Sequence, residues 1–456
     1  MNESARKKYD LTRGGILDRL LLVALPIIGT QLVQMSYNLT DMFLLGRVGS
    51  DAVAASGSAG MFIWLSNGLM LLGRMGAEIG VAQSVGRGDV ESARRFSQHS
   101  LIVALVVGSI YALVCLFFSH DLIGFFRIRE AEVAADAARY LSIVAVAMPG
   151  AFVNASVVGT FNGSGNSRMP FFINLTGLGL NILLDPIFIF VLGMGVAGAA
   201  IATAIAQTCV CVLMLRALIG RRDRPFERYA FFERMQVARV RQILRWSFPI
   251  CTESVLFTFF SLFTSRFVAL FGAGAIAVYR VGSQIESLSW LTCIGFSTAI
   301  TAFVGQNYGA GEWGRIRDGV RVSFAAVSAW GVMVTLVLAF AGGGLFAFFL
   351  PDETLTEMGR TFLRILAFCQ ILGCLEAASS GSFRGLGKTL PPSLVSIACN
   401  GLRVPLSYAL SQTALGLNGI WIGMTVGAAM RGVLLTPWLL RTLRDIVGKN
   451  SSKGVI

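Results

Sequence analysis

The chain has 456 residues, of which 55% are hydrophobic and 14% charged, and its mean hydropathy is +0.69. A soluble protein of this length could not bury so much apolar surface, so the composition predicts a polytopic membrane protein. Because cationic residues of membrane proteins usually mark cytoplasmic loops, the net charge of +13 does not point to a nucleic-acid ligand.

Twelve apolar stretches follow one another and leave little sequence for a soluble domain. Each is close to the ~20 residues that a membrane-spanning helix needs. The first has no small-residue cleavage site after it, which predicts an uncleaved span and not a signal peptide. In chain order, the predicted spans lie near 16–45, 52–82, 98–120, 138–161, 168–192, 196–219, 243–271, 276–305, 320–350, 361–383, 390–413 and 418–442.

The charges between the spans predict the orientation of the chain. Arginine and lysine gather on one predicted side, whereas the loops of the other side are mixed or acidic, so both termini are expected to be cytoplasmic. The cationic residues are Arg6, Lys7, Lys8, Arg13, Arg87, Arg94, Arg95, Arg216, Arg221, Arg222, Arg224, Arg228, Arg234, Arg239, Arg241, Arg315, Arg317 and Arg321, and the acidic loops hold Asp121, Glu130, Glu132, Asp136, Asp352, Glu353 and Glu357.

The two halves of the chain are similar in sequence. "VAQSVGRGDVESARR" at 81–95 aligns with "VGQNYGAGEWGRIRD" at 304–318, and "FNGSGNSRMP" at 161–170 aligns with "FRGLGKTLPP" at 383–392. Six spans in each half give both halves the same orientation, as in parallel-repeat transporters. We therefore predict an N-terminal bundle at 1–219, a cytoplasmic linker at 220–242 and a C-terminal bundle at 243–456.

Four polar residues of the N-terminal half fall inside predicted spans: Asp41, Asn181, Asp185 and Thr203. An ionisable residue there costs roughly 2.5–3.5 kcal/mol on insertion scales. Counting from the nearest turns at 1.5 Å per residue places Asp41, Asp185 and Thr203 at one level, about 9–12 Å below the helix ends, and Asn181 lies one helical turn from Asp185 on the same face. Two carboxylates in such a pocket need a shared proton or a cation, and oxygen ligands suit a hard cation. The alternative is a structural hydrogen-bond cluster between helices.

Further residues are weaker candidates. Pro26 and Pro186 each remove a helical hydrogen bond and allow a kink. Arg74 and Glu78, four apart in one span, would pair with each other. Glu253, Glu286 and Glu376 lie in the C-terminal half beside Arg266, Arg280, Arg403 and Arg431, and form either a substrate site or internal salt bridges. The eight cysteines read as buried packing residues, and two histidines, His99 and His120, exclude a histidine-based metal or protease motif.

With these features the chain resembles the multidrug and toxic compound extrusion (MATE) transporters. The resemblance rests on "LPIIGTQLVQMSYNLTDMFLLGRVG" at 25–49, "VGRGD" at 85–89, "NGSGN" at 162–166 and "NILLDPIFIFVLGMGVAGAAIAT" at 181–203. The last stretch looks like the branch with DinF-like and archaeal-type members, whose N-terminal bundle carries the coupling site. The matching positions here are Asp41, Asn181, Asp185, Thr203, Tyr140 and Asn154, and the resemblance implies a helix that bends at Pro26. Other branches place coupling carboxylates on spans 7 and 10, where Glu253 and Glu376 lie.

The resemblance implies an antiporter of the cell (inner or plasma) membrane that exports organic cations and amphipathic drugs by alternating access. The coupling ion is H⁺ or Na⁺, with Na⁺ held at Asp41, Asn181, Asp185 and Thr203; no other metal and no cofactor is expected. Membrane lipids and small amphipathic or cationic substrates are the expected partners of a monomer.

Two alternatives remain from the residues themselves. A flippase for lipid-linked precursors or other anionic amphiphiles would use Arg74, Arg266, Arg280 and Arg403. A membrane-embedded enzyme is disfavoured, because the chain has no H-E-x-x-H motif.

Overall fold

The computed structural model describes residues 9–128, 130–220, 225–226, 229, 235–349 and 352–451. Every regular element in these ranges is a helix, which confirms the predicted all-α fold. Part of the predicted linker 220–242 lies outside the described ranges. So do some of the cationic residues used to predict the orientation: Arg6, Lys7, Lys8, Arg221, Arg222, Arg224, Arg228 and Arg234.

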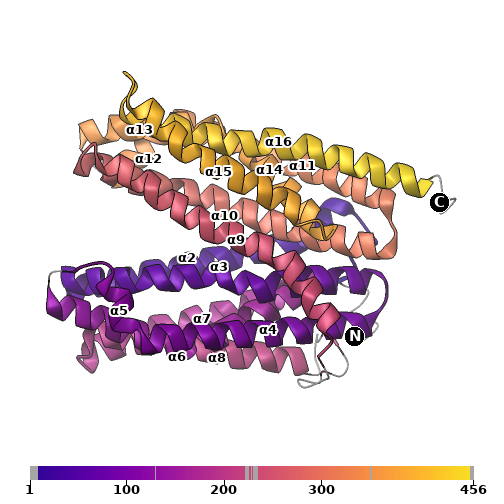
Figure 1. Ribbon diagram of the computed structural model, residues 1–456, viewed down its shortest axis with the longest axis horizontal. Coiled ribbons are helices and arrows are strands. Elements are labelled where there is room, and N and C mark those ends of the chain that lie inside the picture. The colour runs from indigo at the N-terminus through magenta and orange to yellow at the C-terminus, as the bar shows by residue number, and fades with distance from the viewer. Residues whose placement is uncertain are drawn as a thin grey trace. The chain divides into compact units, whose positions relative to one another are not determined.

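The helices of each half run side by side along their length (Figure 1). Those of the first half are α2 (Ile16–Val48), α3 (Ser50–Gly86), α4 (Val90–Phe117), α5 (Ser119–Gly124), α6 (Ala131–Gly163), α7 (Arg168–Pro186), the π-helical turn η1 (Ile187–Val191) and α8 (Gly195–Ile219). Those of the second half are α9 (Val237–Ala269), α10 (Ala273–Ala310), α11 (Trp313–Leu336), η2 (Val337–Ala341), α12 (Gly342–Phe349), α13 (Glu353–Ala367), α14 (Gln370–Gly385), α15 (Leu390–Ser411) and α16 (Leu417–Ser451).

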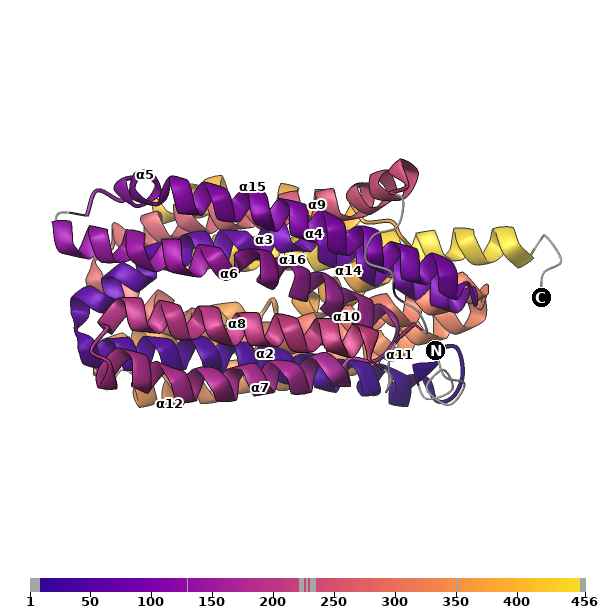
Figure 2. The ribbon, with the colours of Figure 1, turned by 90° about the horizontal axis from the view of Figure 1, so that it is seen from below.

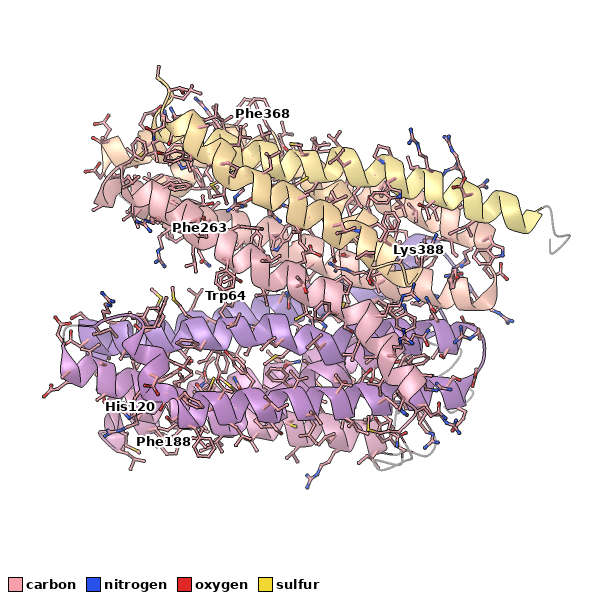
Figure 3. All side chains as sticks on the ribbon, viewed as in Figure 1. Trp64, His120, Phe188, Phe263, Phe368 and Lys388 are labelled. Atoms are coloured by element: carbon pink, nitrogen blue, oxygen red, sulfur yellow. The ribbon has the colours of Figure 1, made fainter. Side chains whose placement is uncertain are left out.

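All twelve predicted spans are helical, and the layout is six in each half. Ten helices of the described chain are long and apolar enough to cross a membrane, and the pair α13 and α14, bent by 47°, makes an eleventh span. The predicted span at 390–413 is the helix α15, whose apolar sequence is interrupted by Asn400 and Arg403. Large exposed apolar side chains such as Phe263 and Phe368 project from the helices of the second half (Figure 3), as expected of residues that face lipid.

Packing divides the chain into two units. Unit 1 contains residues 25–251 together with 1–11, and unit 2 contains residues 252–456 together with 12–24. The helices α2 and α9 therefore each belong to both units, and each carries a proline next to the point of division, Pro26 or Pro249. The bundle boundaries expected from the sequence, at 219 and 243, stay predictions.

The internal repeat is visible in the closest helix contacts of each unit. In unit 1, Gly159 and Gly163 of α6 lie against the backbone of α3 at Arg74 and Glu78, where a side chain would clash with a carbonyl oxygen. In unit 2, Gly381 and Gly385 of α14 lie in the same way against Ser297 and Thr301 of α10. The offsets between equivalent positions, 222 for the glycines and 223 for the residues they contact, match the sequence repeat. Small residues four apart let membrane helices approach closely.

One packing pair is inverted between the units. In unit 1 the ring of Phe96 on α4 fills the space beside Gly80 on α3, so that a Cβ on Gly80 would lie 2.5 Å from the ring. In unit 2 the ring comes from the other helix, because Phe303 on α10 fills the space beside Gly319 on α11. Arginine stacks on the ring in both units: Arg239 over Phe96 and Arg315 over Phe303.

This inversion predicts a compensated pair of substitutions. Gly319→Phe alone places two rings in the space of one, and we expect it to destabilise unit 2 by about 1–3 kcal/mol or to prevent folding. The double variant Phe303→Gly, Gly319→Phe recreates the arrangement of unit 1 and should recover most of the lost stability. The melting temperature of the purified protein in detergent measures both. A double variant that is no more stable than Gly319→Phe would refute the compensation.

Candidate functional site

Four polar side chains predicted from the sequence come together where α2, α7 and α8 lie side by side in unit 1 (Figure 2). Within α7, the Asn181 Nδ2 donates to the Asp185 Oδ1 over 3.1 Å, as their spacing of four predicts. The Thr203 hydroxyl of α8 donates to the Asp41 Oδ2 of α2 over 3.4 Å. Asp41 also interacts directly with Asp185 and Asn181, so three helices share one polar group.

The group is buried. Asn181 and Asp185 have no exposed surface and Thr203 keeps only 4%. One oxygen of each of three residues, Asp41 Oδ1, Asn181 Oδ1 and Asp185 Oδ2, is buried without a hydrogen-bond partner among the described residues. The unpartnered atoms of these three residues are all acceptors, which suits a bound proton or cation.

No arginine, lysine or histidine in the described chain forms an ion pair with Asp41 or Asp185. Two carboxylates that meet in a low-dielectric interior cannot both stay charged without compensation. The donor set of two carboxylates, one amide and one hydroxyl fits a hard cation such as Na⁺. Within the described residues there is also no cluster of three or more His, Cys, Asp or Glu side chains that would hold a transition metal.

Two tyrosines complete the group. Tyr140 of α6, which the family resemblance indicated, interacts with Asp41, Thr203 and Asp185. Tyr37 interacts with the same three residues, and its hydroxyl is buried without a hydrogen-bond partner. The sequence analysis missed Tyr37. The available signal was its position four residues before Asp41, which puts both on one face of α2.

Asn154 of α6 is not joined to this group by any described hydrogen bond, and its Oδ1 is buried without a partner. Pro26 lies fifteen residues before Asp41 in the same helix, next to the point where α2 passes from unit 2 to unit 1. Its carbonyl accepts a hydrogen bond from the Thr30 hydroxyl over 2.9 Å. The roles expected of Asn154 and Pro26 stay predictions.

The backbone directly after Asp185 is irregular. The helix α7 ends at Pro186, and the π-helical turn η1 follows at Ile187–Val191. A π-turn accommodates one extra residue in a helix. The repeat offset falls from 222 at the helix starts Arg168 and Leu390 to 221 at the glycines Gly195 and Gly416, both with positive φ. Because α15 runs to Ser411 without a π-turn, the extra residue of the first half is accommodated beside its buried carboxylate.

Two hollows lie near the group in unit 1. One, of about 360 Å³, lies between α2 and α7 and is lined by Leu39, Thr40, Phe43, Leu44, Ile182 and Pro186. The other, of about 330 Å³, is lined by the end of α2, the start of α3, Asp136, Arg139 and the turn 193–197. Val48 of this second hollow is seven residues beyond Asp41, a distance of about 10 Å along the helix.

The charged residues of the other predicted sites lie apart from this group. Arg74 and Glu78 approach to 3.7 Å within α3, so the expected pairing is found. In unit 2, Glu376 lies 3.8 Å from Arg431 and accepts a hydrogen bond from Ser380, and Glu253 accepts one from Ser393. Glu286 interacts electrostatically with Arg403. Glu253 interacts electrostatically with Arg384, so all three carboxylates have basic neighbours, unlike Asp41 and Asp185.

His99 and the cysteines serve packing. The His99 Nε2 accepts the backbone N–H of Gln236 over 2.8 Å, which leaves Nδ1 to donate to the Arg95 carbonyl over 2.7 Å. Both ring nitrogens are therefore used in fastening the start of α9 to α4. All eight cysteines are free thiols, and only Cys209 is partly exposed.

Comparison with known proteins gives the family. The chain is 27% identical over 427 residues to the "Probable multidrug resistance protein NorM" of Thermotoga maritima, covering 92% of this chain and 91% of that protein. Its fold matches the "Crystal structure of MATE in complex with MaD3S" with a TM-score of 0.91 at 22% identity, over 97% of this chain and 99% of that one.

A second solved structure is similar in fold. It is described as "Reverse polarity of binding pocket suggests different function of a MOP superfamily transporter from Pyrococcus furiosus", and it matches with a TM-score of 0.89 at 23% identity over 96% and 98% of the two chains. The family model MatE matches residues 26–187 and, a second time, residues 249–409. The two matches begin at Pro26 and Pro249 and together cover most of the chain, which therefore belongs to the MatE family of membrane transporters.

Proposed function

We propose that this protein is a multidrug antiporter that exports organic cations and other amphipathic compounds in exchange for H⁺ or Na⁺. The observation that carries the proposal is the buried pair Asp41 and Asp185, which has unpartnered oxygens and no basic partner in the described chain. Relatives named as multidrug resistance proteins support the substrate class. We place the chain in the DinF-like and archaeal-type branch, because its carboxylates without basic neighbours lie in the first half.

The mechanism follows from the charge of the group. When a proton or Na⁺ enters from outside, it neutralises Asp41 and Asp185 and removes the attraction for a cationic substrate, which is released. Loss of the ion to the cytoplasm restores the negative charge and the affinity for substrate. By linkage, ion and substrate must each weaken the binding of the other by the same factor. The bend expected at Pro26 would let α2 adjust to the two charge states.

The orientation that this exchange requires is the one predicted from the charges. Arginines cluster at one end of α4, where Arg94 and Arg95 both pair with Glu91. With this end in the cytoplasm, as the positive-inside rule predicts, the turn at 193–197 and the adjoining hollow face outward. The ion then reaches Asp41 from the outside over about 10 Å. We propose that the protein works as a monomer in the cell membrane with no cofactor.

Neutralising either carboxylate should abolish exchange. We expect Asp41→Asn and Asp185→Asn to reduce drug-driven ion movement in proteoliposomes to the level of protein-free vesicles, because the group can no longer change its charge as required. Imposing a proton or a sodium gradient separately on wild-type vesicles identifies the coupling ion. Asp121→Asn, which neutralises an exposed carboxylate in unit 1, is the matched control and should transport as wild type does. Wild-type exchange by Asp41→Asn would refute the assignment.

The neighbouring amide should set the ion affinity. Asn181→Ala removes a hydrogen bond to the Asp185 carboxylate and an unpartnered oxygen, so we expect the half-saturating ion concentration to rise by about tenfold, which corresponds to about 1.4 kcal/mol. Asn174→Ala removes an amide of the same helix that donates to the Pro170 carbonyl and not to the group, and should shift the same concentration by less than about twofold. Ion titrations of transport rate compare the two variants. Equal shifts would show that the amide contact is not what matters.

A flippase for anionic amphiphiles is the second candidate. Arg266 on α9 and Arg280 on α10 are exposed, so they are available to bind an anionic substrate. The reversed pocket polarity named for the Pyrococcus furiosus protein is a precedent within the same fold. Absence of drug transport by the wild-type protein under both gradients would favour this candidate, and lipid-linked substrates would then be assayed.

A further inference from the structure

The repeat assigns each residue of the candidate site a counterpart in unit 2. The offset is 223 at both Pro26/Pro249 and Gly49/Gly272, which bracket Asp41, so its counterpart is Thr264 on α9. The offset is 222 from the starts of α7 and α15, so the counterpart of Asn181 is Arg403 and that of Asp185 is Ser407, both on α15. In unit 2 a buried arginine thus stands in place of the amide of unit 1, and two hydroxyls stand in place of its two carboxylates.

The same two helices are joined at this place in both units. In unit 1, Asn181 of α7 interacts with Asp41 of α2. In unit 2, the Arg403 Nη2 of α15 donates to the Thr264 hydroxyl of α9 over 3.3 Å. The backbone frame of the site is therefore retained, while the charge that it holds is changed from negative to positive.

Arg403 makes few of the hydrogen bonds that its guanidinium can make. It is only 8% exposed, its one described hydrogen bond is the contact with Thr264, and its Nε–H is buried without a partner. Burying a donor without a partner costs about 1–3 kcal/mol. The planar fork of an arginine matches a carboxylate, which accepts two parallel hydrogen bonds from it.

A second arginine and two aromatic rings lie beside this group. Arg431 of α16 is close enough to Arg403 to interact with it electrostatically, and its Nε–H is also buried without a partner. The ring of Phe257 lies 5.9 Å from the guanidinium of Arg403, and the ring of Trp290 lies 5.9 Å from that of Arg431. Phe257 is 37% and Trp290 is 42% exposed, so aromatic surface next to the arginines is accessible.

We propose that unit 2 holds a binding subsite for the carboxylate of a zwitterionic aromatic amphiphile, with Arg403 as the residue that receives the carboxylate and Arg431, Phe257 and Trp290 beside it. The subsite deepens the proposed drug export by naming a substrate class, and it rests on that proposal.

Glu286 acts as the competitor of the substrate. It interacts electrostatically with both Arg403 and Arg431, and Glu376 lies 3.8 Å from Arg431, so these two carboxylates compensate the arginines when no substrate carboxylate is bound. A substrate carboxylate must compete with Glu286 for the same guanidinium. Removing the charge of Glu286 should therefore strengthen the binding of a zwitterion, whereas removing the charge of Arg403 should weaken it.

The test uses two dyes that differ in one charge, rhodamine B with its free carboxylate and the methyl ester of rhodamine B. Fluorescence polarisation gives their dissociation constants for the full-length protein in detergent, at one pH and without a gradient. We expect Arg403→Gln to weaken rhodamine B by about tenfold or more, the value of one charge-assisted hydrogen bond, and to leave the ester within about twofold. Glu286→Gln should tighten rhodamine B and not the ester. Arg441→Gln, an exposed arginine of α16, is the control and should change neither.

The two substitutions are expected to change the affinity for rhodamine B in opposite directions. If Arg403→Gln fails to fold, Glu286→Gln and the charge-preserving Arg403→Lys still test the proposal. Arg403→Lys keeps the charge but loses the fork, and should bind rhodamine B with an affinity between wild type and Arg403→Gln. Equal weakening of both dyes in Arg403→Gln, or no tightening of rhodamine B in Glu286→Gln, would overturn the subsite. Neither outcome bears on coupling at Asp41, which is measured by transport under a gradient.

Discussion

The burial of Asp41 and Asp185 without a basic partner among the residues that the structure describes is the constraint on which the first unit depends. A carboxylate inside apolar helices is tolerated only when other groups compensate it. Here α7, α8 and α6 supply Asn181, Thr203 and Tyr140 at the depth of Asp41. The irregular turn η1 begins two residues after Asp185, in the segment from Arg168 to Gly195, which is one residue longer than its counterpart from Leu390 to Gly416. The buried polar group and the irregular backbone turn are therefore adjacent in the same helix.

The two units share the same helix packing but differ in the charge of the side chains at equivalent positions. The glycine contacts between α3 and α6 recur between α10 and α14, and the inverted pair of Phe96 and Phe303 fills equivalent space from opposite helices. Packing of this kind is set by volume, so exchange of a large and a small residue is tolerated when both change. The charge of the site is free to differ between the units, because charge depends on the ligand that is bound and not on how the helices pack.

Hydropathy was sufficient to predict the helices, since a long apolar stretch in a membrane has few alternatives to a helix. Counting residues from the turns also brought Asp41, Asp185 and Thr203 to one level, because helical rise is regular. Tyr37 was missed although it shares a face with Asp41. The partners of Glu253, Glu286 and Glu376 were not predictable, because they depend on the rotation of each helix about its axis. The turn η1 changes one hydrogen-bond register, which leaves no mark in composition.

Two sites of opposite sign in equivalent frames cannot do the same work. A carboxylate pair in a low-dielectric interior changes its charge when a proton or a cation binds, and so can report the ion gradient to the substrate. An arginine stays protonated at every pH that a cell experiences, so its charge cannot follow the gradient. Unit 1 is therefore suited to coupling and unit 2 to recognition. On this argument a duplicated carrier needs only one half to keep titratable groups, and the other half is free to change its charge with the substrates it meets.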